Sequence, residues 1–168
     1  MSTAEHTQVY IPDDKVAWIA AQVLSATGDT FEVQTQGDAS EEFLSDHPKD
    51  GAHRTVPKAA VCLQNVLPED GCSDMVHLNY LHEAAILYNL KTRFHRGLPY
   101  TYTGPICIAV NPYKWLDIYN PKVQSTYMDV EKLPELPPHV YAVSARSYHH
   151  MRVFGETKAS LSVASRGG

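Results

Sequence analysis

The sequence has few cysteines and no basic cluster, and these shortages exclude several classes of protein. Its 168 residues hold three cysteines, Cys62, Cys72 and Cys107, at irregular spacing and without a Cys-x-x-Cys pair. This pattern supports neither a disulfide framework nor a zinc site, and it favours a reducing compartment. The formal net charge is -5, and lysine and arginine do not cluster. Because nucleic-acid-binding proteins usually carry a basic stripe, we expect no nucleic-acid partner.

Long hydrophobic runs are missing as well. No segment approaches the ~20 apolar residues of a membrane-spanning helix. The polar segment Met1 to Gln8 lacks the apolar centre of a signal peptide. Hydrophobic residues nevertheless make up 43% of the chain, close to the fraction in globular proteins. The composition therefore predicts a folded, soluble, cytoplasmic protein.

The nine histidines do not form a metal-binding pattern. His149 and His150 are adjacent and would point to different sides of a helix, whereas ligands on one helix face are three or four residues apart. His77 and His82, on one predicted helix, are five residues apart. We expect no metal site, and the order of the residues alone cannot assign a catalytic triad.

The first part of the chain, residues 9–61, has the pattern of an antiparallel meander. In its clearest strand Phe31, Val33 and Thr35 fall on one face, as expected of a half-buried sheet. Gly28 supplies a hairpin turn, and the polar segment 37–51 reads as a loop between strands. The predicted strands are Val16–Ile19, Gln22–Ser25, Thr30–Thr35 and Arg54–Val56.

Beyond a turn-rich linker at 68–74 the periodicity becomes helical. A helix is predicted from Glu83 to Phe94, with Gly97 and Pro99 ending it. Its apolar stripe, which we expect to face a core, consists of Ile86, Leu87, Leu90 and Phe94. Two acidic residues are expected to cap helix starts, Asp74 and Glu83.

The rest of the chain predicts one strand and two helices. Ile106–Val110 is uniformly apolar, the pattern of a strand buried on both faces. A short helix is predicted around Lys122 to Met128. Pro138 is placed to begin a longer helix through Tyr148. The tail, residues 152–168, holds only a weak apolar run.

Several blocks of this second part resemble the motor head of myosins. Asn111-Pro112, followed after six residues by Tyr119, resembles the family's purine-binding loop. Upstream, Asp74 to Glu83 is similar to the entry into the motor core, and the segment from Pro138 to Ser144 to a helix beyond that loop. Together these blocks cover Asp74 to Met151, after which the resemblance fades.

The resemblance implies a fold of the α+β class. A small antiparallel β-barrel, similar to Src-homology-3 domains, would occupy residues 9–61. The incomplete α/β beginning of a P-loop-type motor domain would occupy residues 74–168. The barrel assignment depends on its position in the chain and on Ala17-Trp18-Ile19.

The resemblance also implies a nucleotide site. In myosins the purine-binding loop lies against the adenine of ATP, which requires an aromatic or apolar surface, polar groups for the base edge and a stiffening proline. Trp115 would cover the base, and Lys114 would meet a ribose or phosphate oxygen. The residues that match by position are Asn111, Pro112, Tyr113, Lys114, Trp115 and Tyr119. The alternative is that Tyr113 and Trp115 only pack at a strand-to-loop corner.

ATP hydrolysis needs a phosphate loop, Gly-x-x-x-x-Gly-Lys-Ser/Thr, and the sequence contains none. Counted from the Pro138 helix, this loop should begin near Val163–Gly168. We therefore expect a truncated head that lacks catalytic residues and binds ATP and Mg²⁺ weakly or not at all. The cause of the truncation stays open.

For the intact protein, the resemblance implies an actin-activated ATPase that moves on actin filaments, is cytoskeleton-associated and binds its light chains beyond these residues. Whether this chain is itself an enzyme stays open. The alternative hypothesis is a non-catalytic interaction module, in which the barrel binds a peptide and the remainder is a degenerate arm.

Overall fold

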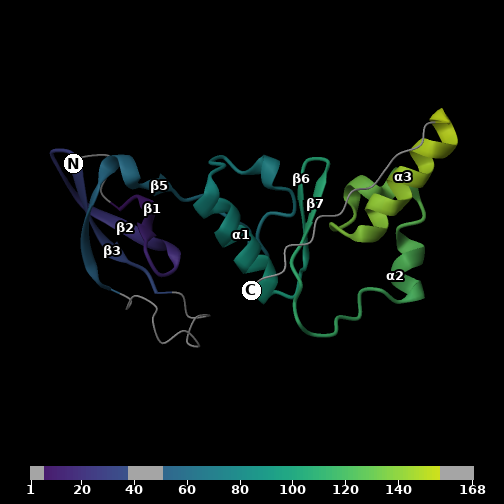
Figure 1. The fold of residues 1–168 in the computed structure, drawn as a ribbon, viewed down its shortest axis with the longest axis horizontal. Coiled ribbons are helices and arrows are strands. Elements are labelled where there is room, and N and C mark those ends of the chain that lie inside the picture. Colours follow the sequence, from purple (N-terminus) through teal and green to yellow (C-terminus); the bar gives the residue numbers. More distant parts are fainter. Residues whose placement is uncertain (1–5, 38–50, 156–168) are drawn as a thin grey trace.

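The computed structural model describes residues 6–37 and 51–155, and Figure 1 shows them as an elongated arrangement with a β-sheet at one end and helices at the other. In chain order the elements are β1 (Gln8–Asp13), β2 (Ala17–Thr27), β3 (Thr30–Thr35), β4 (His53–Pro57), η2 (Lys58–Ala60), β5 (Cys62–Leu63), η3 (Met75–His77), α1 (Glu83–His95), β6 (Tyr100–Thr103), β7 (Ile106–Ala109), α2 (Pro121–Thr126), η4 (Val130–Glu135) and α3 (Val140–Phe154).

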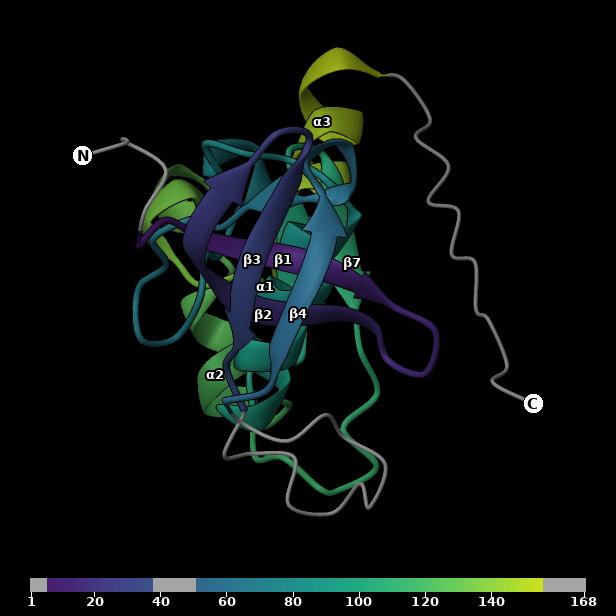
Figure 2. The same ribbon diagram turned by 90° about the vertical axis from the view of Figure 1, so that its left-hand side faces the viewer.

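The five N-terminal strands form one antiparallel sheet in the order β4-β3-β2-β1-β5. The sheet curls on itself, so that β1 and β2 cross behind β3 and β4 (Figure 2). The expected α+β class, a small antiparallel sheet followed by the start of a motor domain, is confirmed. The proposed division at residues 9–61 and 74–168 stays a prediction.

Two predicted strands, Val16–Ile19 and Gln22–Ser25, are one continuous strand. The 11-residue β2 contains both except for Val16, which precedes it, and the ladder with β3 shifts register between Val23 and Ser25. Such a bulge bends a strand and increases its twist, which lets one long strand serve both halves of a curled sheet. β1 is not among the predicted strands, because Pro12 inside it breaks the usual strand signal.

The core of the sheet follows the expected alternation. Val33 and Thr35 of β3 are buried, and Phe31 is partly buried on the same side. The buried cluster comprises Val9, Ile11, Ile19, Ala21, Val23 and Val33. β1 is buried on its other face too, because the ring of Tyr10 packs at a tilt against that of Tyr88 in α1, with ring centroids 4.4 Å apart. The barrel is thereby docked on α1.

The helix predicted from Glu83 is α1, but its expected apolar stripe is not its buried face. Leu87 is exposed and the rest of the stripe is half-buried. The buried residues are Ala84, Ala85, Asn89 and Arg93. Asn89 exchanges two hydrogen bonds with the backbone of Cys72. Polar side chains can occupy this face because backbone partners satisfy them.

The caps were predicted partly correctly. Asp74 caps η3, since its carboxylate accepts the N–H of Val76. At α1 the capping residue is His82, whose Nδ1 accepts the N–H of Ala85, and Glu83 lies in the first turn instead. The prediction that His77 and His82 share a helix is wrong, because His77 belongs to η3 and His82 precedes α1.

The strand predicted at Ile106–Val110 is present as β7 (Ile106–Ala109), but the prediction that it is buried on both faces is wrong. β7 pairs with β6 only, in a two-stranded antiparallel hairpin, and Ile106 is 61% exposed. A run of apolar residues suits a strand that is covered on both faces, and other elements have to provide that cover. Among the described residues no element covers both faces of β7.

The two helices after the hairpin confirm their predictions with shifted ends. α2 begins at Pro121, and α3 begins after Pro138, which precedes the capping residue His139 rather than occupying the first turn. α3 continues through the first residues of the predicted tail and ends at Gly155 with a left-handed φ of 66°. A second buried cluster joins these elements, comprising Tyr127, Leu133 and Ala142.

Candidate functional site

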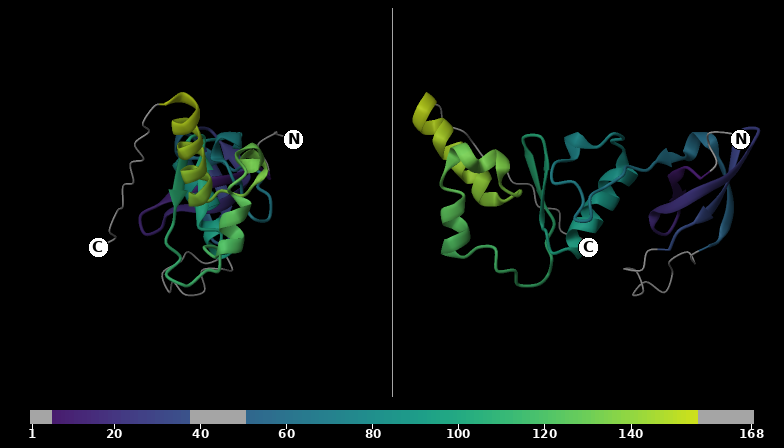
Figure 3. Two further views of the ribbon diagram at one scale, coloured as in Figure 1. Left: turned by 90° about the vertical axis from the view of Figure 1, so that its right-hand side faces the viewer. Right: turned by 180° about the vertical axis from the view of Figure 1, so that it is seen from behind.

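The predicted site begins where the β6–β7 hairpin ends. Val110 donates its N–H to the carbonyl of Pro99 at 2.9 Å, and the chain then leaves the hairpin. Residues 111–119, which we call the 111–119 loop, run along the outside of the molecule to α2 (Figures 1 and 3). The hairpin thus fixes the direction in which the loop departs.

The first turn of the loop is built by Asn111. Its Oδ1 accepts the N–H of Tyr113 at 2.9 Å, across the intervening Pro112. Tyr113 has a φ of +50°, a left-handed conformation that is uncommon for an aromatic residue and costs energy. The side-chain bond of Asn111 and the fixed φ of Pro112 hold this strained turn.

The middle of the loop presents two aromatic rings to solvent. Tyr113 is 90% exposed and Trp115 is fully exposed, with the exposed Lys114 between them. Leu116 and Ile118, in the same loop, are half-buried. The packing alternative for Tyr113 and Trp115 is therefore wrong within the described residues. Both rings are accessible to a planar partner.

The far end of the loop is anchored to α3 and the hairpin. The hydroxyls of Tyr119 and Tyr100 are hydrogen-bonded at 2.7 Å. The backbone carbonyl of Tyr119 accepts the hydroxyl of Tyr141 at 2.9 Å, and the carbonyl of Ile118 lies 3.0 Å from Nε2 of His139. Tyr119, unlike Tyr113 and Trp115, thus serves to hold the loop.

His139, which sequence reasoning missed as a site residue, lies at the centre of this anchor and is 4% exposed. Its Nδ1 accepts the N–H of Tyr141, so Nε2 carries the hydrogen donated to Ile118. Burial lowers the pKa of His139, which favours the neutral ring that these two bonds require. The sequence signal for this position is that His139 directly follows two prolines and directly precedes a helical pattern, which is where a helix-capping residue is expected. The rings around it belong to Tyr100, Tyr119, Tyr127 and Tyr141.

Asn120 connects the loop to α2. Its Oδ1 accepts the N–H of Val123, and its Nδ2 donates to the backbone and side chain of Asp117. Pro121 follows at the first helical position, where no hydrogen bond is lost. The carboxylate of Asp117 is therefore engaged in shaping the loop.

The loop offers stacking surfaces and polar edge groups rather than acid–base chemistry. Within residues 6–37 and 51–155, no three His, Cys, Asp or Glu side chains are grouped to hold a metal ion. The three cysteines are free thiols. The segment Val163–Gly168, where a phosphate loop was expected, lies outside the described residues, as do residues 38–50 of the predicted polar loop. No helix in the described part of the chain is long and apolar enough to cross a membrane.

Comparison with known protein families agrees with the resemblance in the second part of the chain. The family model described as myosin head (motor domain) matches residues 72–167. The match begins just before Asp74, includes the whole 111–119 loop and continues past Met151, so the expectation that the resemblance fades there is wrong. It also covers the part of the chain that the alternative hypothesis treats as a degenerate arm. Because the match spans more than half of the sequence, the chain belongs to the myosin head (motor domain) family.

Proposed function

We propose that the 111–119 loop binds the purine ring of ATP in a myosin motor, and that the intact protein hydrolyses ATP to move on actin filaments. One observation carries the site assignment: the rings of Tyr113 and Trp115 are exposed while both ends of their loop are held by hydrogen bonds. An aromatic surface on an anchored loop can stack a base with little loss of loop freedom.

Within the proposed site the residues have different roles. Trp115 and Tyr113 supply faces for the base, and Lys114 supplies a cation for the ribose or phosphate side. Asn111 and Tyr119 position these groups through their hydrogen bonds, and Pro112 does so through its fixed φ. In the intact motor, ATP and Mg²⁺ would be held mainly by a phosphate loop. Cytoskeletal location and light-chain binding also belong to the proposal for the intact protein.

The 168-residue chain should bind nucleotide weakly. Stacking on an aromatic side chain contributes roughly 1–3 kcal/mol per base, whereas even millimolar affinity requires about 4 kcal/mol. We expect adenosine and Mg-ATP to bind with similar affinities, in the millimolar range or weaker, and ATP not to be hydrolysed. Micromolar affinity for Mg-ATP, or turnover above a protein-free blank, would contradict this part of the proposal.

The site itself is tested by titrating isotope-labelled chain with adenosine and following backbone amide shifts by NMR. The shifts should be confined to residues 111–119 and should weaken or vanish in the Trp115→Ala variant. Tyr148→Ala is the matched control, since Tyr148 is an exposed aromatic residue on α3. Shifts concentrated elsewhere, or equal losses in the two variants, would refute the assignment of the loop.

A further inference from the structure

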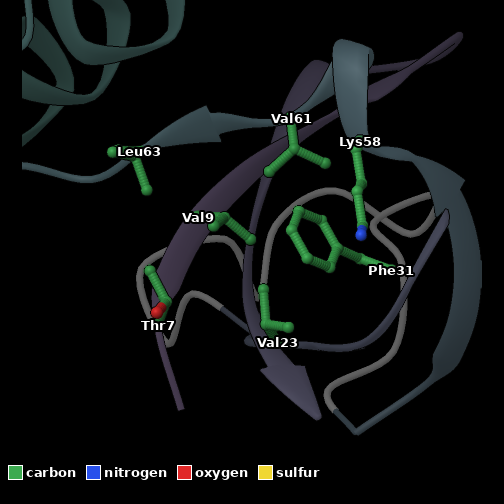
Figure 4. Close-up of a pocket in the computed structure, with 7 residues that line it drawn as sticks. All are labelled: Thr7, Val9, Val23, Phe31, Lys58, Val61 and Leu63. Atoms are coloured by element: carbon green, nitrogen blue, oxygen red, sulfur yellow. The ribbon is translucent and has the colours of Figure 1, made fainter. Parts of the chain in front are cut away.

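Among the described residues no strand pairing joins β4 to β5, and a pocket lies beside η2. β4 and β5 are the two edges of the sheet, and η2 connects them. The pocket has a volume of about 480 Å³. Its lining comes from η2 and from residues in or next to β1, β2, β3 and β5. The lining residues, drawn in Figure 4, are Thr7, Val9, Val23, Phe31, Lys58, Val61 and Leu63.

The pocket is about half open to solvent and lies over the buried core of the sheet. Val9 and Val23 belong to the buried core of the sheet and are each 1% exposed. Leu63, also in the lining, is 42% exposed. Pockets for small molecules are mostly apolar, hold a few polar groups and have volumes of roughly 300–1,000 Å³. This pocket meets those criteria.

Lys58 is the one charged side chain among these lining residues. Its ammonium lies 5.2 Å from the ring centroid of Phe31, and Figure 4 shows its stem extending beside that ring. Within the described residues no carboxylate forms an ion pair with Lys58. A cation–π contact of about 0.5–1 kcal/mol explains its position but leaves its hydrogen-bond donors available to an anion.

We propose that this pocket binds a small amphipathic monocarboxylate, with a compact apolar body against Val9, Val23 and Val61 and its carboxylate at the ammonium of Lys58. The valine floor requires an apolar group, and the single cation matches a single negative charge. A half-open pocket of this volume suits a small molecule better than an extended peptide.

The test uses the whole 168-residue chain and a pair of probes of one shape. 4-Phenylbutyrate carries the charge and 4-phenylbutanamide does not. Each is titrated to about 10 mM while backbone amides are followed by NMR, since fragments of this size bind in the millimolar range. We expect both probes to shift the amides of Val9, Val23 and Val61, with the carboxylate binding about three- to fivefold more tightly.

Two variants separate the charge from the cavity. Lys58→Met removes the charge and shortens the unbranched side chain by one atom. It should abolish the preference for the carboxylate without weakening the binding of the amide. Lys122→Met, an exposed lysine on α2, should leave the preference intact. Leu63→Trp, at a half-exposed position in the lining, should weaken both probes by filling part of the pocket.

The outcomes are decisive even if a variant folds poorly, because the probe pair is compared on the unaltered chain first. Absence of binding, or shifts outside the pocket lining, overturns the proposal. Equal affinity for the two probes also overturns it, as the charge would then have no partner. A carboxylate preference that survives Lys58→Met assigns the anion to another cation and refutes the role of Lys58.

Discussion

Gly71 lies against two side chains of α1 and has a left-handed φ of +71°. A Cβ at this position would come within 2.9 Å of both Arg93 Cγ and Asn89 Oδ1. We expect Gly71→Ala to lower the free energy of unfolding by about 2–4 kcal/mol, from backbone strain and overpacking together. Gly28 also has positive φ, but a Cβ there would meet no atom within 4 Å, so Gly28→Ala measures the strain alone. Equal losses of the two variants in urea unfolding would disprove the contact argument.

His139 should make the stability of the fold depend on pH. Burial lowers its pKa below the ordinary 6.5, against a smaller opposing effect of the bond to Ile118. As the pH falls below 6.5, the unfolded chain binds a proton that the folded chain does not, so the free energy of unfolding decreases until the pH reaches the folded pKa. Well above that range this group has no effect.

The measurement is urea unfolding between pH 5 and 8, about the range over which histidine titrates. In His139→Gln the side chain keeps a donor and an acceptor but does not titrate, so part of the acid-induced loss should disappear. The exposed His149 is the control, and His149→Gln should retain the full pH dependence. An unchanged pH profile in His139→Gln would contradict the assignment.

At the scale of elements, α1 depends on polar contacts that periodicity does not reveal. Arg93 donates to the carbonyls of Asp70 and Tyr100 and to the hydroxyl of Thr101, all from segments on either side of the helix. Helical spacing predicted the extent of α1 well, because its start and end signals are local. It did not predict which face is buried, since that face is defined by backbone acceptors brought together only in the fold.

The contact between α1 and the barrel can be tested at one hydroxyl. The Tyr88 hydroxyl oxygen accepts the backbone N–H of Ala20 in β2 at 2.8 Å. Tyr88→Phe leaves this N–H without that partner, and we expect a loss of about 1–3 kcal/mol in the free energy of unfolding. Faster hydrogen exchange at Ala20 should accompany it. Tyr148→Phe, at an exposed position, should change neither quantity. An equal loss of stability in Tyr148→Phe would contradict the role of the Tyr88 hydroxyl.

The candidate site was predictable in part. Asn111, Pro112 and Tyr119 were identified from the resemblance to the purine-binding loop of myosins. The structure gives Asn111 and Tyr119 hydrogen bonds that position the loop, while ligand binding by the loop stays a prediction. The rings that anchor Tyr119 were not identified, because Tyr100, Tyr141 and His139 are distant in sequence. Contacts of that kind arise only when the hairpin and α3 come together.

At the scale of the whole molecule, the barrel and the region beyond Asp74 have unequal cores. The barrel cluster joins strands of one five-stranded sheet, whereas the hairpin has two strands and a free outer edge in the described part of the chain. We therefore expect native-state hydrogen exchange to be slower at Val23 and Val33 than at amides of β6 and β7. Slower exchange in the hairpin than in the barrel would show that the second part is the more stable one.

The ring of His139 both caps α3 and binds the carbonyl of Ile118, so one side chain belongs to a helix start and to the end of the loop. Thermodynamic linkage gives this sharing a consequence. A ligand whose binding to the loop alters these hydrogen bonds changes the free energy of displacing α3, and a partner that displaces α3 changes the affinity of the loop by the same factor. Through this shared histidine, ligand binding to the loop and displacement of α3 affect each other to the same extent.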